Sequence, residues 1–123
     1  MDLVQGTSLE EIFQRPTFLK EFSIERITSI FYQILDAVAY LASEGIMHRD
    51  LKPANILVDK DDRVKIIELG LASYIDVPAY VFKRCGSAGY IAPEVFHYVC
   101  DAPSTKYNDR CDVFSIGCIL FDM

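Results

Sequence analysis

The fold is decided by one stretch of the chain, which reads Ile46-Met47-His48-Arg49-Asp50-Leu51-Lys52-Pro53-Ala54-Asn55-Ile56-Leu57-Val58-Asp59. The apolar residues at both ends predict two short buried strands, and the polar residues between them predict a loop. This loop carries a carboxylate at Asp50, an amine at Lys52 and a carboxamide at Asn55. Three chemically different groups placed so closely together indicate a site for chemistry.

Phosphoryl transfer to a hydroxyl group uses all three of these groups. A carboxylate accepts or orients the hydroxyl proton, an amine neutralises charge on the moving phosphoryl group, and a neutral oxygen binds Mg²⁺. The stretch closely resembles the catalytic loop of protein kinases, in the form His-Arg-Asp-Leu-Lys-Pro-x-Asn that is typical of the serine/threonine branch. The resemblance implies that Asp50 and Lys52 are catalytic and that Asn55 is a metal ligand. Alone, they would read as a turn aspartate, a solvated lysine and a turn asparagine; their spacing favours catalysis.

A second kinase motif is present in an altered form. The family has Asp-Phe-Gly, where the aspartate binds Mg²⁺, and this sequence has Glu68-Leu69-Gly70. Leu69 keeps an apolar plug, while Glu68 keeps the charge but adds one methylene, which moves the carboxylate by about one ångström. Because Mg²⁺ requires near-octahedral oxygen geometry, such a shift costs activity. Two outcomes stay open: Glu68 is a working metal ligand with reduced activity, or the site is catalytically silent.

A third stretch resembles the end of the kinase activation segment, and it reads Cys85-Gly86-Ser87-Ala88-Gly89-Tyr90-Ile91-Ala92-Pro93-Glu94. The resemblance puts Ser87 at the position whose hydroxyl bridges toward Asp50 and Lys52, with Gly86 and Tyr90 as its neighbours in the motif. This form is typical of serine/threonine kinases. Glu94 would take a structural role, but without the arginine that usually pairs with it.

Three further residues have structural roles in the resemblance. His48 fits a packed, hydrogen-bonded ring better than an acid or base. Arg49 occupies the position that often captures an activation-loop phosphate. Between Tyr74 and Ser87 the only hydroxyl belongs to Tyr80, so we expect no phosphate switch of the usual sort. Asp112 would accept hydrogen bonds from the backbone of the catalytic loop, a role compatible with its alternative reading as a helix N-cap.

The nucleotide site is predicted from the resemblance at the start of the chain. Residues 1–9 match the hinge and the first helix of the helical lobe, so backbone groups of Asp2, Leu3 and Val4 would meet the adenine edge. Leu57 would pack beneath the adenine ring, or would be an ordinary strand residue. The implied cofactors are ATP and Mg²⁺.

Periodicity and turn signals predict the remaining elements. Ser8 caps a short helix that Pro16 ends, and Ser23 caps a long helix that Gly45 ends. Its apolar stripe, predicted to be core, comprises Ile27, Ile30, Phe31, Ile34, Leu35, Val38 and Leu41. Runs 56–58 and 64–67 predict a hairpin, 68–94 a long functional loop, 93–98 one or two helical turns, and 112–123 a helix buried nearly all round.

The resemblance implies an α+β, protein-kinase-like fold, of which residues 1–123 are a fragment of the mainly helical C-lobe with a short β-hairpin beside the catalytic loop. This partial domain would contain the hinge, the first two C-lobe helices, the catalytic loop, the activation segment and the start of the buried central helix. The glycine-rich loop and the strand lysine that holds the phosphates would precede Met1. We therefore expect a serine/threonine kinase domain whose isolated piece is inactive; the alternative is a pseudokinase or scaffold.

Composition limits the partners and the compartment. The chain has 123 residues, a net charge of −6 and a pI near 4.8, which argue against nucleic acid or an anionic membrane as partner. The expected partners are ATP and a protein bearing serine or threonine. The four cysteines form no Cys-x-x-Cys pair and the first residues lack the pattern of a secretory signal, so we expect reduced thiols in the cytoplasm or nucleus.

Overall fold

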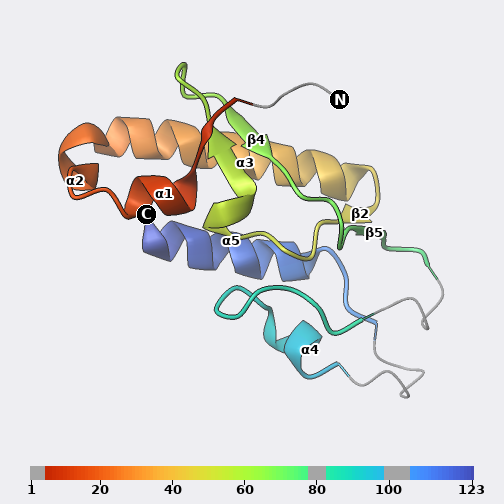
Figure 1. The fold of residues 1–123 in the computed structure, drawn as a ribbon. Coiled ribbons are helices and arrows are strands. Elements are labelled where there is room, and N and C mark those ends of the chain that lie inside the picture. Colours follow the sequence, from red (N-terminus) through yellow and green to blue (C-terminus); the bar gives the residue numbers. More distant parts are fainter. Residues whose placement is uncertain (1–4, 78–82, 99–105) are drawn as a thin grey trace.

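The structure is a computed structural model that describes residues 5–77, 83–98 and 106–123 (Figure 1). Its elements, in chain order, are β1 (Thr7–Ser8), α1 (Leu9–Phe13), α2 (Phe18–Glu21), α3 (Ile24–Ser43), β2 (Ile46–Met47), the 3₁₀ turn η1 (Pro53–Asn55), β3 (Ile56–Val58), β4 (Val64–Ile66), β5 (Ser73–Tyr74), α4 (Pro93–Phe96) and α5 (Arg110–Asp122). No helix within these ranges is long and apolar enough to cross a membrane.

Helix α3 is the longest element, and both of its predicted ends are confirmed. The Ser23 side chain accepts a hydrogen bond from the backbone N–H of Arg26 at 3.3 Å, as an N-cap does. Gly45 follows the helix with a φ of 70°, a conformation that glycine adopts without strain. Ile30, Ile34 and Val38, at the centre of the apolar stripe, are buried as predicted. Only Leu35 contradicts the prediction that the stripe is core, because its side chain lies at the edge of the stripe and is exposed.

Helix α1 also begins where the sequence predicts. The Ser8 hydroxyl accepts the N–H of Glu11 at 3.2 Å, and the helix ends before Pro16. Leu9 and Ile12 are buried against the core that α3 supplies. The cap therefore fixes the point at which the chain passes from β1 into the helical layer.

The strands form two small antiparallel sheets. In the first, the order is β1-β3-β4, and β3 and β4 are the predicted hairpin, although the second strand stops at Ile66. In the second, β2 pairs with β5, which brings Ile46 opposite Tyr74. Strand β5 lies inside the stretch that was predicted to be a loop throughout. A two-residue strand has too few residues to show a period, so the sequence could not reveal it.

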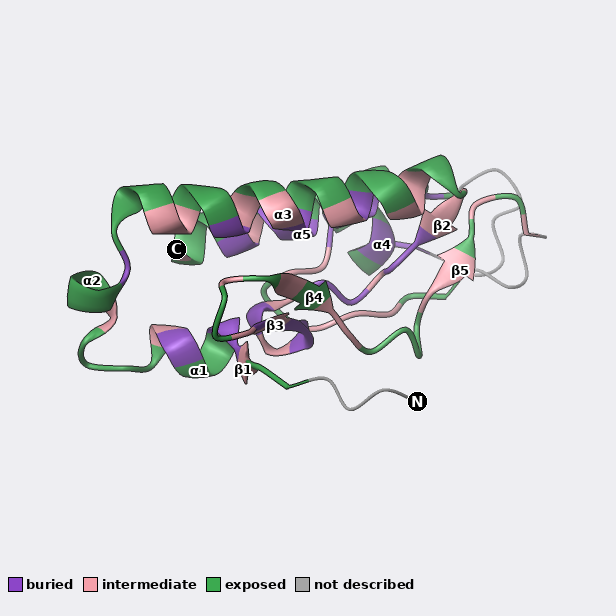
Figure 2. Cartoon of the chain, turned by 90° about the horizontal axis from the view of Figure 1, so that it is seen from above, coloured by how far each residue is buried: buried purple, intermediate pink, exposed green. Residues whose placement is uncertain are grey.

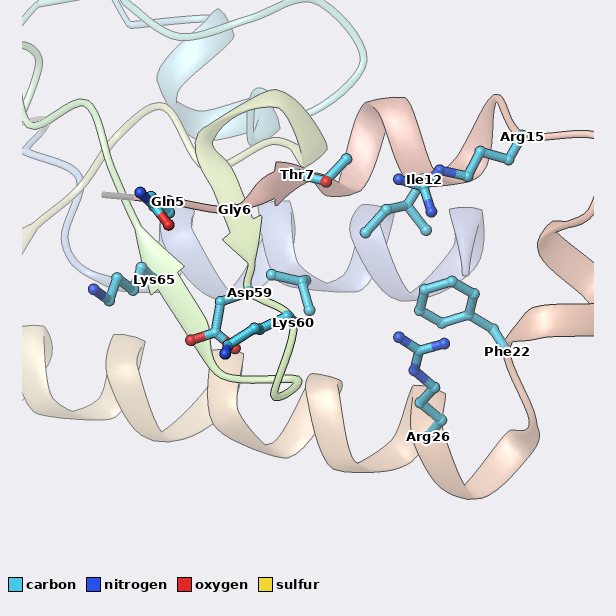
Figure 3. A pocket seen from close by; sticks show the side chains of 11 residues that line it. Gln5, Gly6, Thr7, Ile12, Arg15, Phe22, Arg26, Asp59, Lys60 and Lys65 are labelled. Atoms are coloured by element: carbon cyan, nitrogen blue, oxygen red, sulfur yellow. The ribbon is translucent and has the colours of Figure 1, made fainter. Parts of the chain in front are cut away.

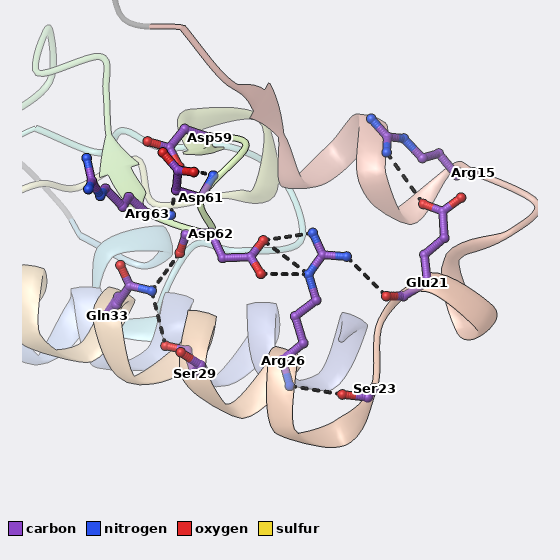
Figure 4. A network of polar contacts seen from close by, with 10 residues as sticks. All are labelled: Arg15, Glu21, Ser23, Arg26, Ser29, Gln33, Asp59, Asp61, Asp62 and Arg63. Carbon is purple, nitrogen blue, oxygen red and sulfur yellow. Dashed lines mark hydrogen bonds and ion pairs between the residues drawn. The ribbon is translucent and has the colours of Figure 1, made fainter.

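A polar network fastens the β3–β4 turn to α3 (Figure 4). The Arg26 guanidinium donates to both carboxylate oxygens of Asp62 at 2.7–3.1 Å. Gln33 donates to the Asp62 carbonyl at 2.8 Å and accepts the N–H of Val64 at 3.0 Å. Because Asp62 has a φ of 58°, the turn is tight, and the network holds it against the helix.

Helix α5 lies alongside α3 (Figures 1 and 2). Ile116 and Ile119 are buried in the core beneath α3. The prediction that this helix is buried nearly all round is wrong for the described chain, because one of its faces is exposed; Phe121 on that face is 91% exposed. Asp112 is not the N-cap either: Asp109 holds that position, and Asp112 lies in the first turn of the helix, which begins at Arg110.

The predicted catalytic loop, residues 48–55, lies between two separate clusters of buried apolar residues. Leu51 belongs to the larger cluster, which α1, α3 and α5 build. Met47 belongs to the smaller cluster, which contains Ala92 and Val95 near α4. Packing on both sides therefore holds residues 48–50, and most of this loop is buried (Figure 2).

Candidate active site

Asp50, Lys52 and Ser87 meet in one hydrogen-bonded group. The Ser87 hydroxyl donates to Oδ1 of Asp50 at 2.6 Å, and Nζ of Lys52 donates to the Ser87 oxygen at 2.6 Å. Nζ of Lys52 also lies 3.3 Å from Oδ2 of Asp50, so the two opposite charges are in direct contact. The structure thus brings the predicted activation-segment serine to the two predicted catalytic residues, 35 and 37 residues away along the chain.

Asn55 closes the loop on Asp50. Its side-chain Nδ2 donates to the carbonyl of Asp50 at 2.8 Å and to Oδ2 at 3.1 Å. This pairing orients the carboxamide, because only the nitrogen can donate. The carboxamide oxygen is therefore the atom that remains for a cation, which suits the metal-ligand role predicted for Asn55.

His48 is fully buried, and its two ring nitrogens have different partners. Nδ1 accepts the backbone N–H of Asp50 at 3.3 Å, and Nε2 lies 3.1 Å from the carbonyl of Ile67. A carbonyl can only accept and an N–H can only donate, so the ring is neutral with its proton on Nε2. The packed, hydrogen-bonded histidine expected from the sequence is what the structure contains.

Asp112 reaches the catalytic loop from α5. Its two carboxylate oxygens accept the backbone N–H groups of His48 at 2.7 Å and Arg49 at 2.9 Å. Burial raises the pKa of this carboxyl group, while the two backbone hydrogen bonds oppose that shift. Arg49 itself has a φ of 67°, so the carboxylate holds the backbone at a strained residue.

Gly86 allows the activation segment to approach the catalytic loop. Its φ is 116°, and a Cβ at this position would lie 2.9 Å from the carbonyl oxygen of Arg49. Any side chain would therefore be excluded twice, by conformation and by space. The next residue is Ser87, so this close approach delivers its hydroxyl to Asp50.

The Arg49 side chain contacts two neutral acceptors. Its Nε donates to the carbonyl of Leu71 at 2.6 Å, and its Nη1 donates to the Tyr107 hydroxyl at 3.0 Å. The sequence does not single out Tyr107 as a functional residue. It lies five residues before Asp112 with no pattern of its own, so only the folded arrangement reveals it.

The altered motif at 68–70 is exposed. Glu68 has a φ of 64°, and its Oε1 lies 2.8 Å from the point that a Cβ on Gly70 would occupy, so the exposed glutamate side chain lies over Gly70. The side chain of Leu69 is 59% exposed; the prediction of an apolar plug is therefore wrong for the described chain.

Within the described residues no three acidic, histidine or cysteine side chains group into a metal site. The candidate ligands are an amide oxygen and a single carboxylate, both oxygen donors of the kind that Mg²⁺ prefers.

The predicted adenine contacts are only partly covered by the structure. Asp2, Leu3 and Val4 lie outside the described residues, as does Tyr80. Leu57 is half-buried between the buried residues Ile56 and Val58 of β3, so its side chain points to the opposite face of the sheet.

The remaining predicted residues lie around α4 and α5. The Tyr90 hydroxyl donates to Asp122 at 2.6 Å, and Ser115 donates to the Tyr90 carbonyl at 2.7 Å. Burial, with this carboxylate as the next cause, raises the pKa of Tyr90 to about 12. Glu94 is exposed in the first turn of α4 and forms no ion pair with another described residue.

A groove of about 600 Å³ lies away from this chemistry, between α1, the start of α3 and the β3–β4 turn (Figure 3). Four cations line it, Arg15, Arg26, Lys60 and Lys65. Arg26 is paired with Asp62 and Arg15 lies 3.6 Å from Glu21, so much of this positive charge is balanced. The groove does not reach the hydrogen-bonded group at Asp50.

Comparisons with known proteins identify the family of the chain. The family model described as "Protein kinase domain" matches residues 1–123. Mouse sperm motility kinase Z is 36% identical over the whole chain, and human mitogen-activated protein kinase 13 is 40% identical over 84% of it. The chain spans 23% and 26% of the lengths of these two relatives.

A solved structure shares the fold. It is entitled "Crystal Structure of the yeast RNA Pol II CTD kinase CTDK-1 complex", and the match has a TM-score of 0.78 and 29% sequence identity. The match covers 93% of this chain and 35% of the solved one. The family model covers the whole chain, and both the relatives and the solved structure are kinases. The chain belongs to the protein kinase family.

Proposed function

We propose that this chain supplies the catalytic loop of a serine/threonine protein kinase, which in the full-length protein transfers the γ-phosphoryl group of ATP to a protein hydroxyl. One observation carries the proposal: the contact of Ser87 with both Asp50 and Lys52, at 2.6 Å each. A loop aspartate and a loop lysine that served only the fold would not need a hydroxyl from a segment so distant in sequence.

The residues have separate roles in this reaction. Asp50 orients the substrate hydroxyl and accepts its proton, with one carboxylate oxygen held by Ser87 and the other beside Lys52. The amine of Lys52 places a positive charge where negative charge on the transferred group would develop. The neutral ring of His48 and the carboxylate of Asp112 keep the loop backbone in this arrangement.

The cofactors are ATP and Mg²⁺. Asn55 and Glu68 would hold the metal ion, which when bound neutralises charge on the phosphates. Asp2, Leu3, Val4 and Leu57 would meet the adenine ring, while the groups that grip the phosphates in the family match nothing in this sequence. We therefore expect the 123-residue chain alone to show no phosphotransfer.

A second candidate function is a scaffold that binds partners without catalysis. Two observations favour it: glutamate replaces the family's metal-binding aspartate, and Leu69 is exposed instead of packed. Asp50, Lys52 and Asn55 favour catalysis, because a scaffold has no use for their mutual contacts.

The test measures transfer of radiolabelled phosphate from ATP to generic serine and threonine peptides by the full-length protein. We expect a measurable baseline that Asp50→Asn abolishes and that Glu68→Asp raises strongly, because the shorter side chain suits the metal geometry. No activity in either the native or the Glu68→Asp form would support the scaffold. Turnover by the 123-residue chain that Asp50→Asn abolishes would contradict the claim that this piece is inactive.

We also propose the cytoplasm or the nucleus as the compartment. The three cysteines within the described residues, Cys85, Cys111 and Cys118, are free thiols, which supports a reducing environment.

A further inference from the structure

Tyr107 lies at the junction of three segments that are distant in sequence. Its ring is buried, with only 5% of the residue exposed, and packs edge-on against Tyr98 with centroids 5.4 Å apart. Met47 and Cys111 belong to the same apolar cluster. This packing fixes the position of the ring and therefore of its hydroxyl group.

The hydroxyl connects the catalytic loop to the residues that precede Ser87. It donates to the carbonyl of Lys83 at 2.6 Å and accepts from Nη1 of Arg49 at 3.0 Å. The backbone N–H of Lys83 lies 3.4 Å from the same oxygen, as a weaker third contact. One hydroxyl thus joins Arg49 to a residue 34 positions further along the chain.

Arg49 also holds a second residue, Leu71, in addition to Lys83. Its Nε donates to the carbonyl of Leu71 at 2.6 Å, so the guanidinium holds Leu71 directly and Lys83 through Tyr107. Within the described residues, the partners of this guanidinium are neutral oxygens, and none is a carboxylate. A charged donor makes strong hydrogen bonds to neutral acceptors in such a half-buried place.

The Tyr107 hydroxyl can serve in this way only while it keeps its proton. Burial raises its pKa above the usual value, although Arg49 acts in the opposite direction. The group therefore donates to Lys83 throughout the neutral range. No negative charge is needed at this junction.

We propose that Tyr107 is a positioning residue, whose hydroxyl fixes residues 83–87 to Arg49 and so places Ser87 against Asp50 without a phosphate group. Between Lys83 and Ser87, Gly86 approaches the Arg49 carbonyl closely. Lys83 is then connected to Arg49 through Tyr107, and Ser87 is hydrogen-bonded directly to Asp50. The connection itself does not depend on catalysis; only its consequence for turnover rests on the proposed function.

The experiment compares trypsin cleavage after Lys83 and Arg84 with cleavage after Arg63, in the native full-length protein and in Tyr107→Phe. Arg63 lies in the β3–β4 turn and serves as the internal reference. Loss of the hydroxyl removes the bonds to Arg49 and Lys83, so we expect cleavage after Lys83 and Arg84 to rise about tenfold, while cleavage after Arg63 stays unchanged. The matched control is Tyr74→Phe, which removes the hydroxyl of an exposed tyrosine and should change neither rate.

Two results would overturn the proposal. One is an unchanged rate after Lys83 and Arg84 in Tyr107→Phe; the other is an equal rise at Arg63, which would indicate a loss of global stability only. Where Tyr107→Phe does not fold, Arg49→Gln tests the connection from the other side, because the Tyr107 ring keeps its packing. It should give the same selective rise, and a uniform or absent rise would again overturn the proposal. Proteolysis requires no phosphotransfer, so this test gives the same answer whether or not the protein has kinase activity.

Discussion

Oδ2 of Asp112 accepts the backbone N–H of His48 at 2.7 Å across 64 residues of sequence. The other carboxylate oxygen accepts the next N–H, that of Arg49. Directly after these two N–H groups the backbone takes the left-handed conformation of Arg49, so the carboxylate holds the chain where it enters a strained residue. A single side chain of α5 therefore anchors the start of the loop that carries Asp50.

The first prediction concerns this side chain. Asp112→Asn keeps one accepting oxygen but places an NH₂ group against the second backbone N–H, where two donors face each other in a buried site. We expect the free energy of unfolding to fall by about 1–3 kcal/mol, measured by urea denaturation at pH 7. The control is Asp109→Asn at the preceding N-cap position, whose side chain makes no capping bond and should change stability by less than about 0.5 kcal/mol. Equal losses in the two variants would contradict this account.

The second prediction separates space from conformation at two glycines. Gly86 and Gly89 both have positive φ, of 116° and 91°, but a Cβ at Gly89 would meet nothing within 4 Å. Gly89→Ala therefore carries only the conformational cost, about 1–2 kcal/mol. Gly86→Ala adds a clash with the Arg49 carbonyl. We therefore expect its free energy of unfolding to be lower than that of Gly89→Ala by about 1 kcal/mol.

Thermal unfolding of both variants checks this difference. If the two alanines cost the same, the close approach at Gly86 is not a constraint in solution. Gly86→Ala should also raise trypsin cleavage after Arg84, since the residues before Ser87 would be displaced.

The third prediction concerns the hydroxyl of Ser87. Ser87→Ala removes the bonds to Asp50 and Lys52 while leaving those two side chains 3.3 Å apart. If the proposed kinase function holds, loss of two charge-assisted bonds should lower kcat/KM of the full-length protein by about ten- to a hundredfold. Ser87→Thr keeps the hydroxyl and should stay close to the native value. A Ser87→Ala enzyme with native kcat/KM would show that the contact has no role in turnover.

The loop between β2 and β3 and the main helices could be predicted because their signals are local. Ser8 and Ser23 lie next to the helices that they cap, and the apolar stripe of α3 repeats within a single element. The spacing of Asp50, Lys52 and Asn55 is set within one short loop. These features need no knowledge of what the rest of the chain does.

The failures have the opposite cause. Strand β5 exists because β2 lies beside it, and Tyr107 matters because Arg49 and Lys83 meet at its hydroxyl. Leu69 and the outer face of α5 are apolar in sequence, and their exposure depends on what surrounds them. Composition reports that a residue is apolar, but only the arrangement of the other elements decides whether it is covered.

The last prediction is a pH dependence that Tyr90 introduces. Its pKa is raised to about 12, chiefly by burial and then by the hydrogen bond to Asp122. A tyrosine in the unfolded chain ionises near pH 10. The folded state therefore holds this proton more tightly, so the stabilisation is complete below about pH 10 and decreases as the pH rises toward 12.

Tyr90→Phe has no proton to lose at this position. Its free energy of unfolding should lie below the native value at pH 8 and approach it as the pH rises from 10 to 12, because only the native protein loses this contribution. Urea denaturation of both proteins at pH 8, 9.5 and 11 measures the difference. Asp122→Asn serves as the control, since removal of the neighbouring charge should bring the pKa of Tyr90 closer to 10. Parallel profiles for the native protein and Tyr90→Phe would mean that the Tyr90 hydroxyl titrates as it does in the unfolded chain, and that its bond to Asp122 does not persist in solution.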